Sequence, residues 1–205
     1  MATPKKIDLY ATHKAEYAAR TKPAIVDVGR AQYLAAAGQG APGSDPFVAA
    51  IGALYGAAFT IKMTRKFAGL QDYAVCKLEG QYFFGAGQDP ADVPRDRWKW
   101  RLLIRTPEAV KARDLRRAVA TLEKRGKAAG VQDVSLETFT EGRCVQMLHV
   151  GPYDRESETL EAMKAFAEQQ GLKMGGPHHE IYLSDPRRVP PQRLKTILRH
   201  PVSNR

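Results

Sequence analysis

The sequence feature that most constrains the fold is a weak internal repeat. Residues 29–34 (GRAQYL) resemble residues 142–148 (GRCVQML), and in both places a further glycine follows nine positions after the first, at Gly38 and Gly151. Each copy then leads into an amphipathic helical pattern and on to further strands. We therefore predict an α+β fold in which a strand–helix–strand–strand module occurs twice. Two antiparallel sheets with helices on one face would leave a ligand cleft between the copies.

Turn and capping signals divide each half into elements. Asp45-Pro46 is a typical helix start, and Gly126 and Gly130 close a second helix. In the first half we predict strands over residues 23–34, 73–86 and 98–105, a helix over 45–67 and a polar loop over 89–97. In the second half we predict a helix over 107–129, a strand pair over 135–150 broken at 141–142, a helix capped by Asp154 or Ser157, a strand over 177–186 and a short final helix from Pro190.

Length and composition set the domain organisation. The chain has 205 residues, and we expect an N-terminal arm over 1–22 followed by one domain over 23–205, with halves at about 23–106 and 107–205. The longest apolar stretch, residues 47–61, contains two glycines and is too short to span a bilayer. Because the N-terminus lacks an apolar leader and Cys76 and Cys144 lack a CxxC spacing, we expect a cytoplasmic protein with reduced thiols and no membrane partner.

The formal net charge of +10 raises the question of a nucleic-acid partner. Basic residues concentrate in residues 111–127 and 187–199, where the first block is a predicted helix with its charges spread around it. No recognition helix, zinc finger or RNA-binding aromatic signature accompanies either block. We interpret both as solvated basic faces rather than as a surface that binds nucleic acid.

The predicted strand over 177–186 carries the most chemically informative residues. Because side chains alternate along a strand, His178, Glu180 and Tyr182 share one face, whereas His179 and Ile181 share the other with Leu183. If the first face lines a cavity, it supplies an acid or base together with an aromatic wall. The alternative is a half-solvated strand of an antiparallel sheet.

The sequence shows no metal-ligand spacing, and we expect neither a metal nor another cofactor. His178 and His179 are adjacent, so on a strand their rings point to opposite faces. No Ser-His or Cys-His pair stands out as a nucleophile with its base, which argues against covalent catalysis. Cys76 and Cys144 lie in strand patterns and are interpreted as buried packing residues.

Taken together, these motifs resemble the GyrI-like small-molecule-binding family over about residues 20–202, nearly the whole chain. The second half carries the densest matches, and Gln81–Phe84 is a departure, since related sequences often have tryptophan there. The matching segments are Tyr33-Leu34, Ala53-Leu54-Tyr55, Leu78-Glu79-Gly80, Ile104-Arg105, residues 136–142, Gln146-Met147, Gly151-Pro152-Tyr153, residues 178–186 and Leu194-Lys195-Thr196.

The resemblance implies a duplicated module of the SHS2 type with a ligand cleft between the copies, in which a glutamate and surrounding aromatic side chains act on the ligand. The family glutamate matches Glu180. Stand-alone members that resemble this chain include hydrolases that open the cyclopropane of DNA-alkylating cyclopropanoid natural products. The predicted function is therefore binding of planar or aromatic xenobiotics with hydrolysis of such a cyclopropane, without a metal.

Adding water to a strained electrophilic ring requires a base, a grip on the ligand and stabilisation of developing charge. Glu180 is the predicted base, because burial against rings raises the pKa of a carboxyl group. Tyr153 is the predicted donor to the ligand oxygen, a role that Tyr182 could fill instead. The remaining predicted ligand-binding residues are Trp98, Trp100 and Tyr82 as stacking walls, His149 as a partner of Tyr153, and His178 beside Glu180.

Each assignment has a structural alternative, and the function has two others. Trp98 and Trp100 could be packing residues, Tyr153 could cap a turn, and His149 could be a hydrogen-bonded structural histidine. The same cleft could sequester amphipathic cations, with Glu180 as the counter-ion and the rings supplying cation–π contact. A third hypothesis is a partner-binding protein of the gyrase-inhibitor kind.

Overall fold

We analysed a computed structural model of the chain, which describes residues 6–18, 20–85, 92–127 and 129–204. Parts of four predictions lie outside the described residues: the N-terminal arm at residues 1–5 and 19, the strand at 86, the loop at 89–91 and the helix at 128. The chain divides into two compact units, and each unit takes segments from distant parts of the sequence. Unit 1 comprises Met1–Thr12, Ala31–Leu78 and Phe84–Phe139, whereas unit 2 comprises His13–Arg30, Glu79–Phe83 and Thr140–Arg205.

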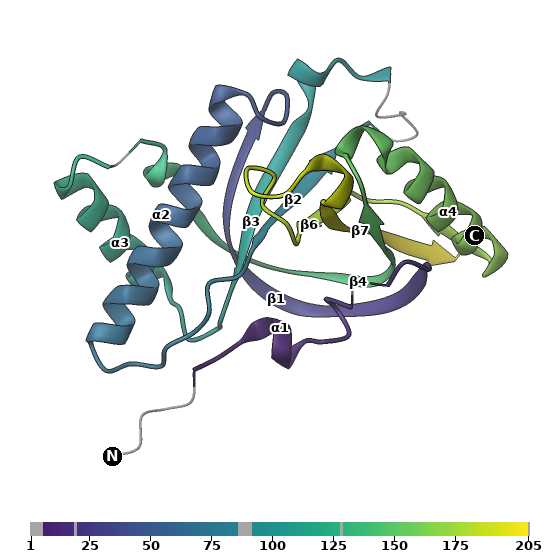
Figure 1. Ribbon diagram of the computed structural model, residues 1–205. Helices are drawn as coiled ribbons and strands as arrows, with labels where there is room; N and C mark the ends of the chain where they lie inside the picture. Colours follow the sequence, from purple (N-terminus) through teal and green to yellow (C-terminus); the bar gives the residue numbers. More distant parts are fainter. Residues whose placement is uncertain (1–5, 19, 86–91, 128, 205) are drawn as a thin grey trace. The chain divides into compact units, whose positions relative to one another are not determined.

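Unit 1 is built on an antiparallel strand pair covered by helices. Strand β1 (Ala24–Gln39) pairs with β3 (Lys99–Thr106) from Gln32↔Thr106 to Gln39↔Lys99. Helix α2 (Asp45–Phe67) packs against β3 and lies side by side with α3 (Ala112–Lys124), as Figure 1 shows. Arg65 of α2 forms an ion pair with Asp114 of α3 at 3.2 Å. The short helix α1 (Leu9–Thr12) also belongs to this unit.

Helix α2 extends beyond residues 47–61, the apolar stretch that is by itself too short to cross a bilayer. It has 23 residues, and by length and composition alone it could span a membrane. Only 33% of its most apolar window is buried inside the fold, and the buried apolar residues of α2 are Phe47, Ala53, Leu54, Ala57, Ala58 and Ile61. Its start follows from Pro46 in the first turn, where the missing N–H removes no helical hydrogen bond.

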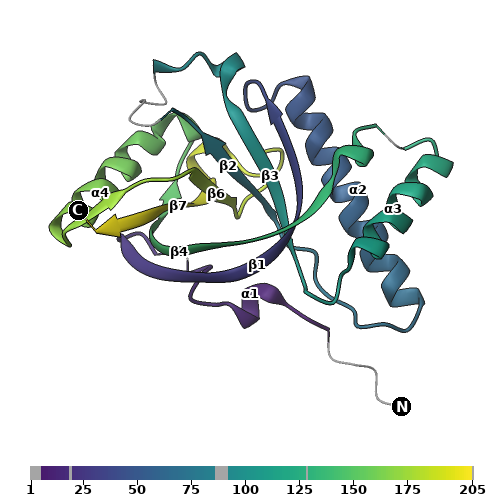
Figure 2. The ribbon, with the colours of Figure 1, turned by 180° about the vertical axis from the view of Figure 1, so that it is seen from behind.

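Unit 2 is organised around strand β7 (Lys195–Asn204). β7 pairs antiparallel with β6 (His178–Tyr182), with β4 (Ser135–Val150) and with β5 (Leu172–Met174). β6 also pairs with β2 (Leu78–Phe83), in a register that places Gly80 opposite Glu180. Helix α4 (Glu156–Gln169) packs on β5 and β7, and its buried Met163 meets Val145 and Leu198 in the core. Figure 2 shows the same strands from behind.

The fold confirms the predicted class. After α1 the order of helices and strands is β1–α2–β2–β3, then α3, and then β4–α4–β5–β6–β7. A strand–helix–strand–strand module thus occurs twice, with α3 between the copies and β5 added to the second. All strand pairings described above are antiparallel. The repeat at residues 29–34 and 142–148 therefore marks the equivalent first strands, β1 and β4, of the two modules.

The predicted final helix from Pro190 is wrong. Pro191–Arg193 forms one 3-10 turn, and the chain then continues as β7. Four consecutive residues, Thr196 to Arg199, are buried, which is the pattern of a strand covered on both faces rather than a helical stripe. The hydrogen bonds that favour a strand over a helix come from pairing with β4 and β6. These strands are separate in sequence, so the local sequence pattern does not reveal the pairing.

Other boundaries also differ from the predictions. β4 is one continuous strand of 16 residues, because Gly142 adopts a φ of 76° and lets the strand bend without ending. α3 begins at Ala112 rather than at 107, after Lys111, whose backbone N–H donates to Asp114. α4 begins at Glu156 after Arg155, so neither Asp154 nor Ser157 is its cap.

A buried charge network holds β6 between its neighbours in unit 2. His179 is fully buried, with Nδ1 2.7 Å from Glu141 Oε1 and Nε2 3.1 Å from Glu79 Oε2. Arg199 of β7 donates to Glu141 Oε2 at 2.7 Å and to Gln146 Oε1 at 2.8 Å. Burial acts to raise the pKa of Glu141, but His179 and Arg199 outweigh it and lower that pKa to about 2.

The same network fastens the segment before β1. Arg199 also donates to the backbone carbonyl of Glu16, and Tyr17 donates its hydroxyl hydrogen to Glu79 Oε1 at 3.0 Å. The Gln146 amide donates to the carbonyl of Ala18 at 3.1 Å. This segment is therefore held to unit 2 by groups that β2, β4 and β7 provide.

We predict that Glu141 makes the fold sensitive to acid. Because its pKa is lower in the folded protein than in the unfolded chain, its stabilisation is present above about pH 4.5 and is lost as the pH falls toward 2. A pKa change from 4.5 to about 2 corresponds to about 3 kcal/mol of unfolding free energy. Urea unfolding between pH 7 and pH 2.5 measures this loss.

The variant Glu141→Gln should be less stable at pH 7 by about 3–5 kcal/mol, because it removes the carboxylate that pairs with both His179 Nδ1 and Arg199. Its stability should also fall less steeply with acid than that of wild type. Glu123→Gln, at an exposed position of α3, is the control and should behave like wild type. Equal acid slopes for wild type and Glu141→Gln would contradict the assignment.

Candidate functional site

Two buried carboxylates and a histidine meet in unit 2. We call Glu156, His178 and Glu180 the glutamate–histidine cluster. His178 and Glu180 lie on one face of β6, as the alternation predicted, and Glu156 is the first residue of α4. His178 Nε2 lies 3.0 Å from Glu180 Oε1 and 4.0 Å from Glu156 Oε2. Glu180 is 7% exposed and Glu156 is 8% exposed. This burial excludes the alternative interpretation, in which the polar face of the strand is half-solvated.

The Glu156 carboxyl group is buried close to a second carboxyl group, that of Glu180. Burial, followed by the negative charge of Glu180, raises its pKa to about 10. Its Oε1 atom is buried and has no hydrogen-bond partner among the described residues. Two carboxyl groups thus share a site in which they repel each other when both are ionised.

A second histidine supports the cluster from behind. His178 Nδ1 lies 2.9 Å from Nε2 of His200, which follows Arg199 on β7. Burial and the neighbouring His178 lower the pKa of His200 to about 3, so its ring is neutral at physiological pH. One of the two facing nitrogens must therefore donate to the other, and this hydrogen bond fixes the orientation of the His178 ring.

Three tyrosines border the cluster. The hydroxyl oxygens of Tyr82 and Tyr182 are 2.6 Å apart, and Tyr153 contacts the Tyr182 ring edge-on at 6.1 Å. Burial and then Glu180 raise the pKa of all three, that of Tyr153 to about 12. The three phenols are consequently protonated and able to donate hydrogen bonds at neutral pH. Tyr153 is 40% exposed and is the most exposed of the three, whereas Tyr82 is 1% exposed.

Gly80 makes room for the tyrosine pair. It lies opposite Glu180 in the pairing of β2 with β6. A Cβ atom at this position would lie 3.0 Å from the Tyr182 hydroxyl and 3.3 Å from the Tyr82 ring. The Leu78-Glu79-Gly80 motif thus places a residue without a side chain where the two phenols meet.

His149, near the end of β4, makes two hydrogen bonds. Its Nδ1 lies 2.9 Å from the Thr159 hydroxyl of α4, and its Nε2 lies 3.1 Å from the carbonyl oxygen of Pro152. Both ring nitrogens are therefore engaged in joining the turn at residues 152–153 to α4. These contacts suit a hydrogen-bonded structural histidine, and a role of His149 in orienting Tyr153 stays a prediction.

The two tryptophans lie in unit 1. Trp100 of β3 is 3% exposed, stands edge-on to Phe47 at 5.3 Å and lies across from Gly38, where a Cβ atom would lie 2.3 Å from the indole. Trp98 donates its indole N–H to the Val93 carbonyl at 3.0 Å and meets Phe84 edge-on. Their contact with a ligand stays a prediction.

Sequence reasoning missed two residues of this site, Glu156 and His200. Glu156 precedes His178 by 22 positions, and only the packing of α4 on β7 brings them together. His200 lies just beyond the wrongly predicted final helix. Had the segment from Lys195 been recognised as a strand antiparallel to β6, the place of His200 beside His178 would have followed from the register. Glu156 carried one weak signal, as an acid in the first turn of a helix.

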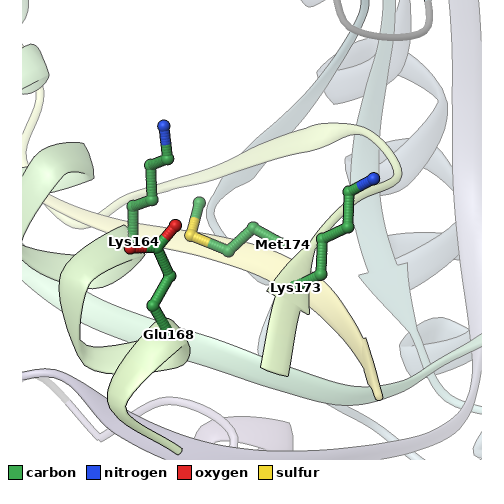
Figure 3. Close-up of a pocket in the computed structure, with 4 residues that line it drawn as sticks. All are labelled: Lys164, Glu168, Lys173 and Met174. Atoms are coloured by element: carbon green, nitrogen blue, oxygen red, sulfur yellow. The ribbon is translucent and has the colours of Figure 1, made fainter. Parts of the chain in front are cut away.

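A pocket elsewhere in unit 2 does not involve the cluster. It has a volume of about 320 Å³ and is lined by Lys164, Glu168, Lys173 and Met174. Figure 3 shows Lys164 and Glu168 extending from α4, and Lys173 and Met174 from β5. Two lysines, a glutamate and a methionine line this pocket, and none of the predicted site residues is among them, so we place the candidate site at the cluster.

The cluster can support two kinds of chemistry. Glu180 can accept a proton from water while a tyrosine hydroxyl donates to an oxygen of the ligand. The sequence analysis expected no metal-ligating group, but the structure brings one ligand atom from each of Glu156, His178 and Glu180 within 4.8 Å of one another, so these residues could hold a metal ion.

The chain matches a known protein family and resembles solved structures over nearly its whole length. Residues 44–203 match the family model of the GyrI-like small-molecule-binding domain. An uncharacterized conserved protein from Listeria innocua is 38% identical with a TM-score of 0.90, and a hydrolase from the same organism is 37% identical with a TM-score of 0.89. Each comparison covers 97% of this chain and 100% of the other.

A more distant structure shares only the fold. The C-terminal domain of EcmrR is 9% identical with a TM-score of 0.56, over 90% of this chain and 98% of that domain. A search of curated proteins gave no match.

We predict that Gly80→Ala disturbs the tyrosine pair. The added methyl group must displace the Tyr182 hydroxyl or the Tyr82 ring, and overpacking of this kind costs about 1–3 kcal/mol of unfolding free energy. Gly29→Ala is the matched control, because a Cβ atom at that strand position meets nothing within 4 Å. Urea denaturation compares the two, and equal stabilities would contradict the placement of the phenols.

Proposed function

Because the chain belongs to the GyrI-like small-molecule-binding domain family, we propose that the glutamate–histidine cluster and its tyrosines bind and hydrolyse a small organic ligand. The leading substrate class is a planar cyclopropanoid alkylating compound, of the kind that the family resemblance implies. The observation that carries the proposal is Glu180 itself, a carboxylate 7% exposed on a strand face shared with His178 and Tyr182. The 37% identical Listeria innocua hydrolase supports the assignment to hydrolysis in general.

Glu180 acts as the base in the proposed reaction. Water forms a bond from its oxygen to a cyclopropane carbon, and the strained carbon–carbon bond breaks. The electron pair moves through the conjugated ring to the carbonyl oxygen, which takes up a proton. The proton lost by water passes to Glu180 and then to solvent, so the product is the substrate plus one water.

His178 and the tyrosines place the reacting groups. His178 contacts Glu180 at 3.0 Å and is itself held by His200, which limits rotation of the carboxylate. Tyr153 donates a hydrogen bond to the oxygen on which charge develops, since its hydroxyl is protonated and accessible. The rings of Tyr153 and Tyr182 offer apolar faces to a flat ligand.

A second candidate function is sequestration without turnover. Two buried carboxyl groups beside tyrosine rings also suit an amphipathic organic cation, held by charge and by cation–π contact. An enzyme consumes its ligand, whereas a sequestering protein returns it unchanged. The cytoplasmic location and the gyrase-inhibitor hypothesis stay predictions.

We predict that Glu180→Gln abolishes turnover of a cyclopropanoid alkylator while retaining much of its affinity, because the amide has the same shape but cannot accept the proton. Mass spectrometry of the compound after incubation detects a product one water heavier. Glu161→Gln, at an exposed position of α4, is the charge-matched control and should keep full turnover. Undiminished turnover by Glu180→Gln would remove Glu180 from the mechanism.

We predict a smaller and more specific effect for Tyr153→Phe. Loss of one hydrogen bond to developing charge should lower kcat by about 10²–10³-fold. KM should change little, because the ring remains. A steady-state kinetic comparison checks this, and a rise in KM with unchanged kcat would instead make Tyr153 a binding residue.

A further inference from the structure

We propose that Glu156, His178 and Glu180 form a binding site for one divalent transition-metal ion of the Zn²⁺ or Co²⁺ type. This inference concerns metal binding and goes beyond the proposed hydrolysis, which requires no metal. It rests on three convergent ligands, on an unpartnered carboxylate oxygen and on the orientation of the histidine.

The ligand atoms converge at distances that suit such an ion. His178 Nε2 lies 3.0 Å from Glu180 Oε1 and 4.0 Å from Glu156 Oε2, and one ligand atom from each residue lies within 4.8 Å of the others. Zinc binds nitrogen and oxygen ligands at about 2.0–2.2 Å, which places neighbouring ligand atoms of a tetrahedral site about 3.3 Å apart. The separations of 3.0 Å and 4.0 Å lie on either side of this value. Small side-chain rotations would therefore bring the ligand atoms to the separations of a tetrahedral site.

One carboxylate oxygen in this cluster makes no hydrogen bond within the described residues. Glu156 is only 8% exposed, and its Oε1 atom has no hydrogen-bond partner among the described residues. A buried carboxylate oxygen without a partner loses its hydration and gains nothing in return. A cation between Glu156 and Glu180 supplies the missing partner and also offsets the repulsion between the two carboxylates.

The histidine is oriented as a metal ligand. His178 Nδ1 faces His200 Nε2 at 2.9 Å, and when Nδ1 donates this hydrogen bond, a cation can take the place of the hydrogen that Nε2 shares with Glu180 Oε1 at 3.0 Å. Metal-ligating histidines generally donate their second N–H in this way, which fixes both the tautomer and the ring orientation. His200 holds the ligand without binding the ion.

The ligand set favours a transition metal over calcium or magnesium. One imidazole nitrogen and two carboxylates match zinc and its neighbours, whereas Ca²⁺ takes about six to eight oxygen ligands. Three protein ligands also leave one position of a tetrahedral ion open. A bound ion would be coordinated by the Glu180 oxygen that accepts a proton in the proposed reaction. This consequence rests on the proposed function.

Titration with Co²⁺ tests the site directly. The full chain, without a polyhistidine tag and after dialysis against a chelator, is titrated with CoCl₂ while the visible d–d absorption is recorded. We expect saturation at one Co²⁺ per chain and displacement by one equivalent of Zn²⁺. Glu156→Gln and Glu180→Gln should each weaken Co²⁺ binding at least tenfold, whereas Glu161→Gln should bind as wild type does.

Either of two results would overturn the proposal. The first is the absence of saturable Co²⁺ absorption in wild type, and the second is wild-type affinity in both Glu156→Gln and Glu180→Gln. Circular dichroism of each variant confirms that a loss of binding does not reflect unfolding. Because the readout is metal absorption, it is independent of turnover: a protein that binds Co²⁺ but hydrolyses nothing contradicts the proposed function alone.

Discussion

The ion pairs of His179 fix the register of β6, and the candidate site depends on that register. His179 lies between Glu79 and Glu141, and Arg199 completes the charge network on the same side. Side chains alternate along a strand, so a shift by one residue would turn His178 and Glu180 away from their partners and expose the buried network. One face of the strand thus provides the specificity of folding, and the other provides the chemistry.

A pair of buried carboxyl groups is the common physical basis of both proposals. Glu156 and Glu180 are more than nine-tenths buried, and the positive groups of the network, His179 and Arg199, face Glu141 instead. A site of this kind gains by taking a proton from water or by binding a cation. The tyrosines beside it add neutral donors and apolar ring faces, which suit a flat organic molecule that develops charge on oxygen.

The sequence predicted features that local pattern determines, and it missed those that depend on long-range packing. Alternation along residues 178–182 placed His178, Glu180 and Tyr182 on one face, and the internal repeat predicted the module order. Glu156 and His200 were missed, because only the packing of α4 and the pairing of β7 bring them to β6. The final helix was wrong for the same reason, since strand pairing overrode a local helical signal. The tryptophans had an apparent functional pattern, yet Trp100 fills the core of unit 1.

The most direct test of the account is a single turnover of a cyclopropanoid alkylator in ¹⁸O-labelled water, with protein in excess over substrate. If Glu180 is a general base, the product carries one ¹⁸O atom, and a peptide digest shows no label in the Glu180 carboxylate. Label in that carboxylate would contradict the account, because it would mean that Glu180 attacks the ring itself. Recovery of unlabelled, unchanged compound would contradict hydrolysis of this substrate class.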